Sequence, residues 1–315
     1  MKNYGLSDRF INESKLYSFS LGRIISQDKG LYRAVTENGE FKAQISGKLR
    51  YNAVNISDYP AIGDFVMLDE NDGNSVIHHI LTRKSAFIRK AAGTSNNDQV
   101  VAANVDTVFI CMSLNKDFNL RRLERYISIG WDSGAVPVVV LTKSDLCGNI
   151  DDIMNDLDEV ALGLEIIITS SLKDDYENIK KYIKYGQTVA FIGSSGVGKT
   201  TLINKLIGED IFETKEIRND DRGRHTTTKR ELILLPEGGV VIDTPGMREL
   251  GIEGADFSKA FADIDDLSQM CRFSDCTHTK EPGCAVRNAV EDGSLSVERL
   301  ESYFKLKKEA KYDGL

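Results

Sequence analysis

Short strand-like segments separated by turn residues occupy the N-terminal part of the chain. Five of them lie between residues 18 and 83, divided by Gly-, Asn- and Asp-rich turns such as "ENGE" and "ENDGN". They read SFSLGRII, LYRAVTE, EFKAQIS, DFVMLDE and SVIHHILTR. Short strands at this spacing are typical of a small closed barrel. We predict an OB-like barrel domain over residues 1–92, with another small barrel or a generic interaction module as the alternative.

A second pattern begins near residue 100, where nearly continuous apolar strands alternate with amphipathic segments. The strands are VDTVFICMS, VPVVVLTK, LEIIITSS, TVAFIGSS and GGVVIDTPG, and each ends in polar residues or glycine. Helical periodicity marks KTTLINKLIG and LRRLERYISIGWDSG, and we expect Trp131 of the latter in the core. This alternation predicts a doubly wound parallel α/β sheet over residues 93–253, with ligands bound at the carboxyl ends of the strands.

Composition limits the class of protein. A length of 315 residues allows two or three domains, and 41% hydrophobic residues with five prolines is ordinary for a globular protein. No run of 18 or more apolar residues occurs, and the N-terminus is polar, so neither a transmembrane helix nor a secretory signal is predicted. We expect a cytoplasmic protein with no membrane partner.

The formal net charge of −8 is unevenly spread. Residues 1–92 carry 13 Lys and Arg against 10 Asp and Glu, residues 93–253 carry 18 against 26, and residues 254–315 carry 9 against 12. A basic surface, of the kind that binds nucleic acid, is therefore expected in the N-terminal segment.

The segment FIGSSGVGKTTLINKL has the G-x-x-x-x-G-K-[ST] pattern of a phosphate-binding loop between a strand and a helix. Its glycines allow backbone N–H groups to approach phosphate oxygens, Lys199 supplies positive charge, and the Thr200 hydroxyl can ligate Mg²⁺. The expected nucleotide-binding residues are Gly193, Ser194, Ser195, Gly196, Val197, Gly198, Lys199, Thr200 and Thr201. This loop does not distinguish ATP from GTP.

Two switch segments are expected after the phosphate loop. In VVIDTPG, Asp243 can hold Mg²⁺ and the Gly246 N–H can contact the γ-phosphate. The preceding segment DDRGRHTTTKREL is polar and suits a mobile switch loop, in which Thr226 or one of the next two threonines completes the Mg²⁺ ligands.

Hydrolysis needs a water held in line with the γ-phosphate. Many GTPases place Gln after D-x-x-G for this purpose, but Met247 occupies that position here. His225 is the nearest titratable candidate, and it either orients the water or docks the loop. We expect His225, Lys199 and Gly246 to be the groups closest to catalysis.

The segment VVVLTKSDLC ends a strand with a candidate base-reading loop, formed by Thr142, Lys143, Ser144 and Asp145. The Asp145 carboxylate can accept hydrogen bonds from guanine N1–H and N2–H₂, donors that adenine lacks. Lys143 can cover the base with its methylene stem. Thr142 stands where the usual N-K-x-D motif has Asn, and its hydroxyl can bond to the phosphate loop. In IIITSSLK, Ser170 and Ser171 are expected to contact the base from the other side.

These motifs follow one another in a rotated order: base loop, second base loop, phosphate loop and two switches. Circular permutation of this kind is tolerated because domain termini often lie close together. The sequence therefore predicts a circularly permuted GTPase domain for GTP and GDP, whose second switch leads directly into the C-terminal segment.

The C-terminal segment, residues 254–315, contains CRFSDCTHTKEPGC. Cys271, Cys276, His278 and Cys284 supply three thiolates and one imidazole, a closed tetrahedral shell for one Zn²⁺. We predict a mainly helical domain with a structural zinc, and a catalytic zinc or an iron–sulfur cluster is the alternative. The lysines of the later SVERLESYFKLKKEAKY form either a contact face or a solvated one.

Taken together, the motifs resemble the RsgA/YjeQ family of circularly permuted GTPases, which act on the small ribosomal subunit. The resemblance spans nearly the whole chain and is carried by TKSD at 142–145, GSSGVGKTT at 193–201, GRHTTT at 223–228, DTPG at 243–246, and Cys271, Cys276, His278 and Cys284 with EPGC. It implies an OB-fold, a permuted GTPase domain and a zinc domain, with GTP hydrolysis stimulated by the small subunit during late maturation. His225 matches a proposed catalytic residue of the family, and Met247 matches its lack of Gln.

We therefore expect a monomeric GTPase whose slow hydrolysis is accelerated by the ribosomal RNA of the small subunit. One rival is an RNA-binding assembly scaffold whose weakly hydrolysing nucleotide site is only regulatory. A second rival, an ATP-dependent metabolic kinase, is opposed by Asp145.

Overall fold

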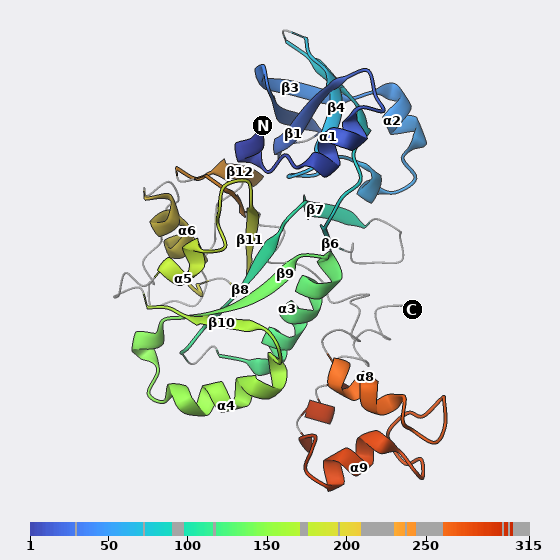
Figure 1. The fold of residues 1–315 in the computed structure, drawn as a ribbon, viewed down its shortest axis with the longest axis vertical. Coiled ribbons are helices and arrows are strands. Elements are labelled where there is room, and N and C mark those ends of the chain that lie inside the picture. The colour runs from blue at the N-terminus through green and yellow to red at the C-terminus, as the bar shows by residue number, and fades with distance from the viewer. Residues whose placement is uncertain are drawn as a thin grey trace.

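The structure is a computed structural model. It describes residues 1–28, 30–71, 73–89, 98–115, 118–170, 176–194, 196–208, 230–236, 238–243, 261–297, 299–301 and 303–304. Figure 1 shows a barrel, a central sheet flanked by helices and a small helical C-terminal domain. The predicted boundary at residue 253 lies outside the described residues, as do the lysines after residue 304.

The N-terminal domain is a five-stranded barrel, as predicted. Its strands are β1 (Ser20–Asp28), β2 (Leu31–Thr36), β3 (Gly39–Ile45), β4 (Phe65–Asp69) and β5 (Ser75–Ile80). They pair in the order β1-β2-β3-β5-β4, and β4 pairs with β1 to close the barrel. Ile24, Val66 and Ile77 pack in its interior, because alternate side chains of a strand point to the same face. The order is that of an OB-fold.

Short helices surround this barrel. They are η1 (Lys2–Tyr4), α1 (Asp8–Ser14), α2 (Gly47–Asn52) and η2 (Ile56–Asp58). The α2 helix joins β3 to β4, and the Ser46 hydroxyl caps its start by accepting a hydrogen bond from the Leu49 N–H at 3.0 Å.

The central domain is built on a sheet with the order β10-β9-β8-β11-β13-β12. Its strands are β8 (Thr107–Ser113), β9 (Val136–Thr142), β10 (Glu165–Ile168), β11 (Thr188–Ile192), β12 (Arg230–Leu234) and β13 (Val240–Asp243). All pairings among β8, β9, β10, β11 and β13 are parallel, which confirms the predicted sheet. Both β8 and β11 are buried along their whole length, so their apolar runs match their surroundings.

Strand β12 departs from the prediction. It runs antiparallel to β13, so the sheet is mixed at this edge. Its first residues belong to the polar segment expected to be a switch loop, and that segment therefore ends before Arg230. The sequence pattern missed this strand because β12 begins with the charged residues Arg230 and Glu231 and follows a long polar stretch.

Helices cover both faces of the central sheet (Figure 1). The helices are α3 (Leu120–Ser133), η3 (Ser144–Leu146), α4 (Ile150–Val160), α5 (Glu177–Lys180) and α6 (Lys199–Ile207). Buried residues of α3 and α4 share one hydrophobic cluster, whereas those of α5 and α6 share the other. Trp131 is half-buried at the edge of the first cluster.

A two-stranded antiparallel sheet, β6 (Ala86–Arg89) with β7 (Gln99–Ala103), stands between the barrel and the central sheet. The sequence pattern did not predict it. The expected boundary at residue 92 falls between these two strands, outside the described residues.

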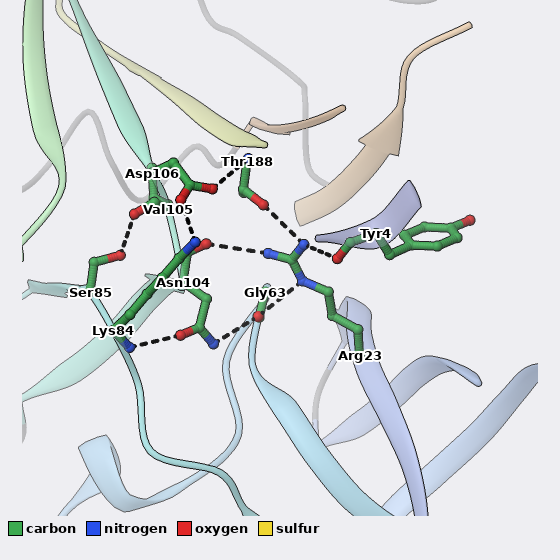
Figure 2. A network of polar contacts seen from close by, with 9 residues as sticks. All are labelled: Tyr4, Arg23, Gly63, Lys84, Ser85, Asn104, Val105, Asp106 and Thr188. Atoms are coloured by element: carbon green, nitrogen blue, oxygen red, sulfur yellow. Dashed lines mark hydrogen bonds and ion pairs between the residues drawn. The ribbon is translucent and has the colours of Figure 1, made fainter. Parts of the chain in front are cut away.

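The barrel is joined to the central sheet by strand pairing and by a polar network. Ser26 and Gln27 of β1 pair with Glu231 and Arg230 of β12, so the two sheets are continuous. Figure 2 shows Arg23 of β1 at the centre of the network, fully buried. Its acceptors are the hydroxyl of Thr188 at 3.0 Å and the backbone oxygens of Gly63, Asn104 and Tyr4, the first two at 3.1 and 3.4 Å.

A second polar group completes this joint. Lys84 donates to one carboxylate oxygen of Asp106, and the other oxygen accepts from the Thr188 N–H at 2.8 Å (Figure 2). The Asn104 side chain donates to the carbonyl of Gly63 at 3.0 Å. Thr188 begins β11, so the joint contacts the strand that leads into the phosphate loop.

The C-terminal domain contains α8 (Ala262–Ser268) and α9 (Ala285–Glu291), with Phe261, Ile264 and Val286 in its core. Within the described residues, no helix has the length and apolarity needed to cross a membrane.

Candidate functional site

The phosphate loop requires glycine at three positions. Gly193, Gly196 and Gly198 have φ of 141°, 79° and 101°, values that side chains with a Cβ rarely adopt. A Cβ on Gly193 would lie 2.3 Å from the carbonyl oxygen of Cys111 on β8. The loop is therefore packed directly on the neighbouring strand, and burial raises the pKa of the Cys111 thiol to about 12, which keeps it neutral.

Lys199 begins α6 and is buried beneath this loop. Its ammonium donates to the carbonyl oxygens of Gly193 at 2.7 Å and Ser194 at 2.6 Å. Thr200 and Thr201 follow in the first turn of α6, half-buried. The arrangement places a positive charge, the N–H groups of a helix start and hydroxyls together, as phosphate binding requires.

The base loop lies against the phosphate loop, although the residues that touch are 53 and 55 positions apart in the chain. The Thr142 hydroxyl donates to the carbonyl oxygen of Val197, the bond to the phosphate loop that the sequence predicts. Lys143, in a left-handed conformation with φ of 57°, donates to the carbonyl of Gly196 at 2.7 Å. Two consecutive residues thus fix the position of one loop on the other.

Asp145 is exposed at the start of η3, where its carboxylate can meet a base. It accepts a hydrogen bond from the Ser170 hydroxyl at 2.6 Å. Ser170 lies two residues after the end of β10 in a buried position, and the Ser144 N–H donates to the carbonyl oxygen of Thr169 in the same segment at 3.2 Å. The two predicted base loops therefore meet, because they follow the neighbouring strands β9 and β10.

Asp243 ends β13, 6% exposed, at the carboxyl edge of the sheet that also carries the phosphate loop. Other predicted site residues lie outside the described part of the chain: Ser171, Ser195, His225, Thr226, Gly246 and Met247. What was predicted for them stays a prediction.

The four predicted metal ligands come together in the C-terminal domain. All ligand atoms of Cys271, Cys276, His278 and Cys284 lie within 4.8 Å of one another. Cys271 Sγ lies 3.8 Å from Cys284 Sγ and 3.6 Å from His278 Nδ1. A tetrahedral zinc centre would have about 3.8 Å between sulfurs and about 3.5 Å between sulfur and nitrogen, so the residues fit Zn²⁺.

The loop between these ligands is held by its own hydrogen bonds. The Glu281 carboxylate accepts from the N–H groups of Thr277, Thr279 and Lys280 at 3.1, 3.0 and 3.0 Å. The Thr277 hydroxyl bond, together with such backbone bonds, lowers the pKa of Glu281 to about 2. His278 is left-handed with φ of 62°. This preformed loop aims the imidazole at the thiols.

Two side chains of α3 make contacts that the sequence did not predict. Arg122 Nη1 donates to the Ser194 hydroxyl of the phosphate loop at 2.9 Å. Glu124, 2% exposed, accepts from Arg299 Nη1 at 2.9 Å. A signal for the second contact exists in the sequence, because Glu124 interrupts the apolar stripe that contains Leu123 and Ile127.

A parallel sheet with a phosphate loop at its centre and a base loop on a neighbouring strand defines a P-loop GTPase. Here the base loop precedes the phosphate loop in the chain, and a barrel and a Cys/His cluster flank the domain. The class is thus a circularly permuted GTPase with two additional domains.

Comparison with known proteins narrows the class to a family. The RsgA GTPase family model matches residues 80–253. The chain is 52% identical over 298 residues to small ribosomal subunit biogenesis GTPase RsgA 2 of Lactiplantibacillus plantarum. This match covers 94% of this chain and 84% of the relative. It is 42% identical over 316 residues to RsgA 1 of Listeria innocua, covering 99% and 90%. The chain belongs to the RsgA GTPase family and is a GTPase.

Solved structures agree with the fold. The crystal structure of YjeQ from Thermotoga maritima is similar with a TM-score of 0.69 and 26% identity, over 92% of this chain and 98% of that one. The crystal structure of YloQ, a circularly permuted GTPase, is similar with a TM-score of 0.67 and 27% identity, over 94% and 96%. The predicted fold class, including the permutation, is confirmed.

Proposed function

We propose that this chain hydrolyses GTP in response to the small ribosomal subunit and assists that subunit's biogenesis by binding its ribosomal RNA. The relatives from Lactiplantibacillus plantarum and Listeria innocua are named small ribosomal subunit biogenesis GTPases, and the likeness extends over nearly the whole chain. A monomer in the cytoplasm is part of the proposal.

The observation that carries the nucleotide assignment is the contact between the base loop and the phosphate loop. Thr142 and Lys143 bond to carbonyl oxygens of Val197 and Gly196, so a nucleotide held by its phosphates has its base directed toward Asp145. The Asp145 carboxylate then selects guanine, because only guanine offers N–H donors on that edge.

The chemistry follows from the groups around the phosphates. Lys199 and the backbone N–H groups of the loop would hold the β- and γ-phosphates. Thr200, Thr226 and Asp243 would hold Mg²⁺, which would supply positive charge against the transferred phosphoryl group. Gly246 contacts the γ-phosphate. His225 orients the attacking water, since Met247 cannot.

The zinc cluster has a structural role in this proposal. Its four residues would close a tetrahedral shell around Zn²⁺, which would leave no position open for a substrate, and the fold of residues 271–284 would then depend on the metal.

Exposed groups of the barrel suit an RNA partner. On α2, Lys48, Arg50 and Tyr51 are exposed, and the Tyr51 side chain is 90% exposed. Positive charge next to an accessible aromatic ring is the combination that binds phosphates and stacks on bases.

The test is the GTP turnover of the full chain with small subunits, with large subunits and with neither, at two salt concentrations. We expect stimulation by small subunits alone, and a steep loss of stimulation at the higher salt because phosphate contacts release counterions. Turnover unchanged by saturating small subunits at low salt would overturn the partner assignment.

Lys199→Ala separates this function from that of a scaffold. We expect the variant to lose subunit-stimulated turnover and its role in assembly together. A variant that still supports subunit maturation while hydrolysing no GTP would favour the scaffold.

Asp145→Asn tests the base loop. We expect GTP affinity to fall by about a hundredfold and preference to shift toward xanthosine triphosphate, because the amide presents a donor where guanine has one. Asp151→Asn, which makes the same change at an exposed position of α4 outside the predicted site, is the control. Unchanged GTP affinity in Asp145→Asn would contradict the base assignment.

A further inference from the structure

The first turns of α3 carry two polar contacts that lead in different directions. Arg122 Nη1 donates to the Ser194 hydroxyl of the phosphate loop at 2.9 Å. Two positions further on, Glu124 accepts from Arg299 of the C-terminal domain at 2.9 Å. A short helical segment therefore contacts both the nucleotide-binding loop and a separate domain.

Ser194 is held from two sides. Lys199 donates to its carbonyl oxygen at 2.6 Å, and Arg122 donates to its hydroxyl. Two cations thus act on one residue at the start of the phosphate loop. Because the guanidinium is a rigid planar fork, its placement depends on where α3 begins.

The placement of α3 is in turn linked to the C-terminal domain. Arg299 binds Asp263 of α8 through Nε at 3.0 Å and Nη2 at 3.1 Å, in addition to Glu124. The side chains of Arg299 and Glu124 are 4% and 2% exposed. A charge pair this deeply buried, with several hydrogen bonds, holds its partners in one arrangement.

We propose that Arg122 is a positioning residue for GTP hydrolysis, and that docking of the C-terminal domain sets its position through Glu124 and Arg299. With the domain docked, Arg122 restrains Ser194, and the loop presents Lys199 to the phosphates. A partner that displaces the domain removes Arg299 from Glu124, releases the start of α3 and lowers the hydrolysis rate. The inference rests on the proposed function, because it concerns control of GTP turnover.

The first experiment compares Arg122→Ala, Arg122→Lys and Arg121→Ala in the full chain, measuring kcat and KM for GTP. Arg121 is the neighbouring arginine and is exposed. Its replacement by alanine makes the same change in charge on the same helix. We expect Arg122→Ala to lower kcat about tenfold, with KM altered less than about threefold, because a displaced loop misaligns the reacting groups. Arg122→Lys should recover part of the rate, and Arg121→Ala should match the unmodified chain.

Equal losses in Arg122→Ala and Arg121→Ala would overturn the positioning role, as would a rise in KM with kcat unchanged. Ser194→Ala provides an independent variant, since it removes the hydroxyl that Arg122 contacts. It should reproduce the kcat of Arg122→Ala. The double variant Ser194→Ala/Arg122→Ala should have about the same kcat as either single variant. Additive losses would overturn the route through Ser194.

The link to the C-terminal domain is tested by Glu124→Gln, alone and combined with Arg122→Ala. We expect Glu124→Gln to lower kcat and to add little in the double variant, because both changes act on the same helix start. Full additivity would overturn the coupling. No turnover in the unmodified chain would refute the proposed function, whereas normal turnover that is insensitive to Arg122→Ala refutes this inference alone.

Discussion

The two joints that attach the outer domains to the central sheet each contain a buried arginine, and different chemistry holds each one. Arg23, at the barrel joint, donates to four oxygens, all of them neutral among the residues that the structure describes. Arg299, at the C-terminal joint, donates to the carboxylates of Glu124 and Asp263. Both guanidinium groups also lie over a phenylalanine ring.

The difference predicts how each joint fails. Burial lowers the pKa of Arg23 to about 10, although the nearby Asp106 and Asp64 act in the opposite direction. Burial therefore opposes the positive charge of Arg23. Removing Arg23 would leave neutral oxygens, which water can satisfy. Removing Arg299 would leave the carboxylate of Glu124 buried and that of Asp263 half-buried without their cation, which costs far more. The barrel joint is therefore expected to tolerate change better than the C-terminal joint.

Metal removal should produce the largest loss of stability, and this loss should be confined to the C-terminal joint. Chelation is expected to unfold residues 271–284 and to release the C-terminal domain, because structural zinc contributes about 10–16 kcal/mol to folding. Amide hydrogen exchange should show loss of protection in α9 with β1–β5 unchanged, and added Zn²⁺ should restore it. An intact α9 after verified loss of zinc would contradict a structural metal.

Arg299→Met should have the next largest effect. Glu124 and Asp263 lose their shared cation, so we expect the docking of the C-terminal domain to weaken by about 3–5 kcal/mol. Exchange protection of α8 and α9 measures this. Arg287→Met is the control, because Arg287 pairs with Glu291 on the surface at 3.4 Å, and it should have almost no effect.

Arg23→Met should destabilise the barrel joint by about 1–3 kcal/mol, less than the change at Arg299. The lost hydrogen bonds are partly offset because no charge then needs to be buried. Exchange protection along the β1–β12 pairing reports the effect. A loss larger than that of Arg299→Met would reverse the comparison between the joints.

Thr188→Val should have the smallest effect. Valine keeps the shape of the side chain but removes one of the acceptors of Arg23, which costs about 0.5–1.5 kcal/mol. Thermal unfolding measures the change, and Thr188→Ser, which keeps the hydroxyl, should retain the hydrogen bond. A larger destabilisation by Thr188→Ser than by Thr188→Val would show that the methyl group, and not the bond to Arg23, matters at this position.

Much of the fold and part of the site follow from local sequence. The barrel strands, the parallel strands and the loops at their ends were predicted, because alternation and apolar runs report burial directly. The β6–β7 pair and β12 were not. Strand β12 is stabilised by pairing with β1 of the barrel, which lies far away in sequence, as well as with the neighbouring β13.

The sequence by itself determined which residues could bind phosphate, guanine and zinc, because these sites depend on residue types at fixed spacing in one loop. Only the tertiary structure decided that Lys143 also bonds to the phosphate loop, and that Arg23, Arg122 and Arg299 connect separate parts of the chain. An arginine in a sequence does not show whether it is buried or which oxygens surround it, since those partners come from distant segments that meet only when the chain folds.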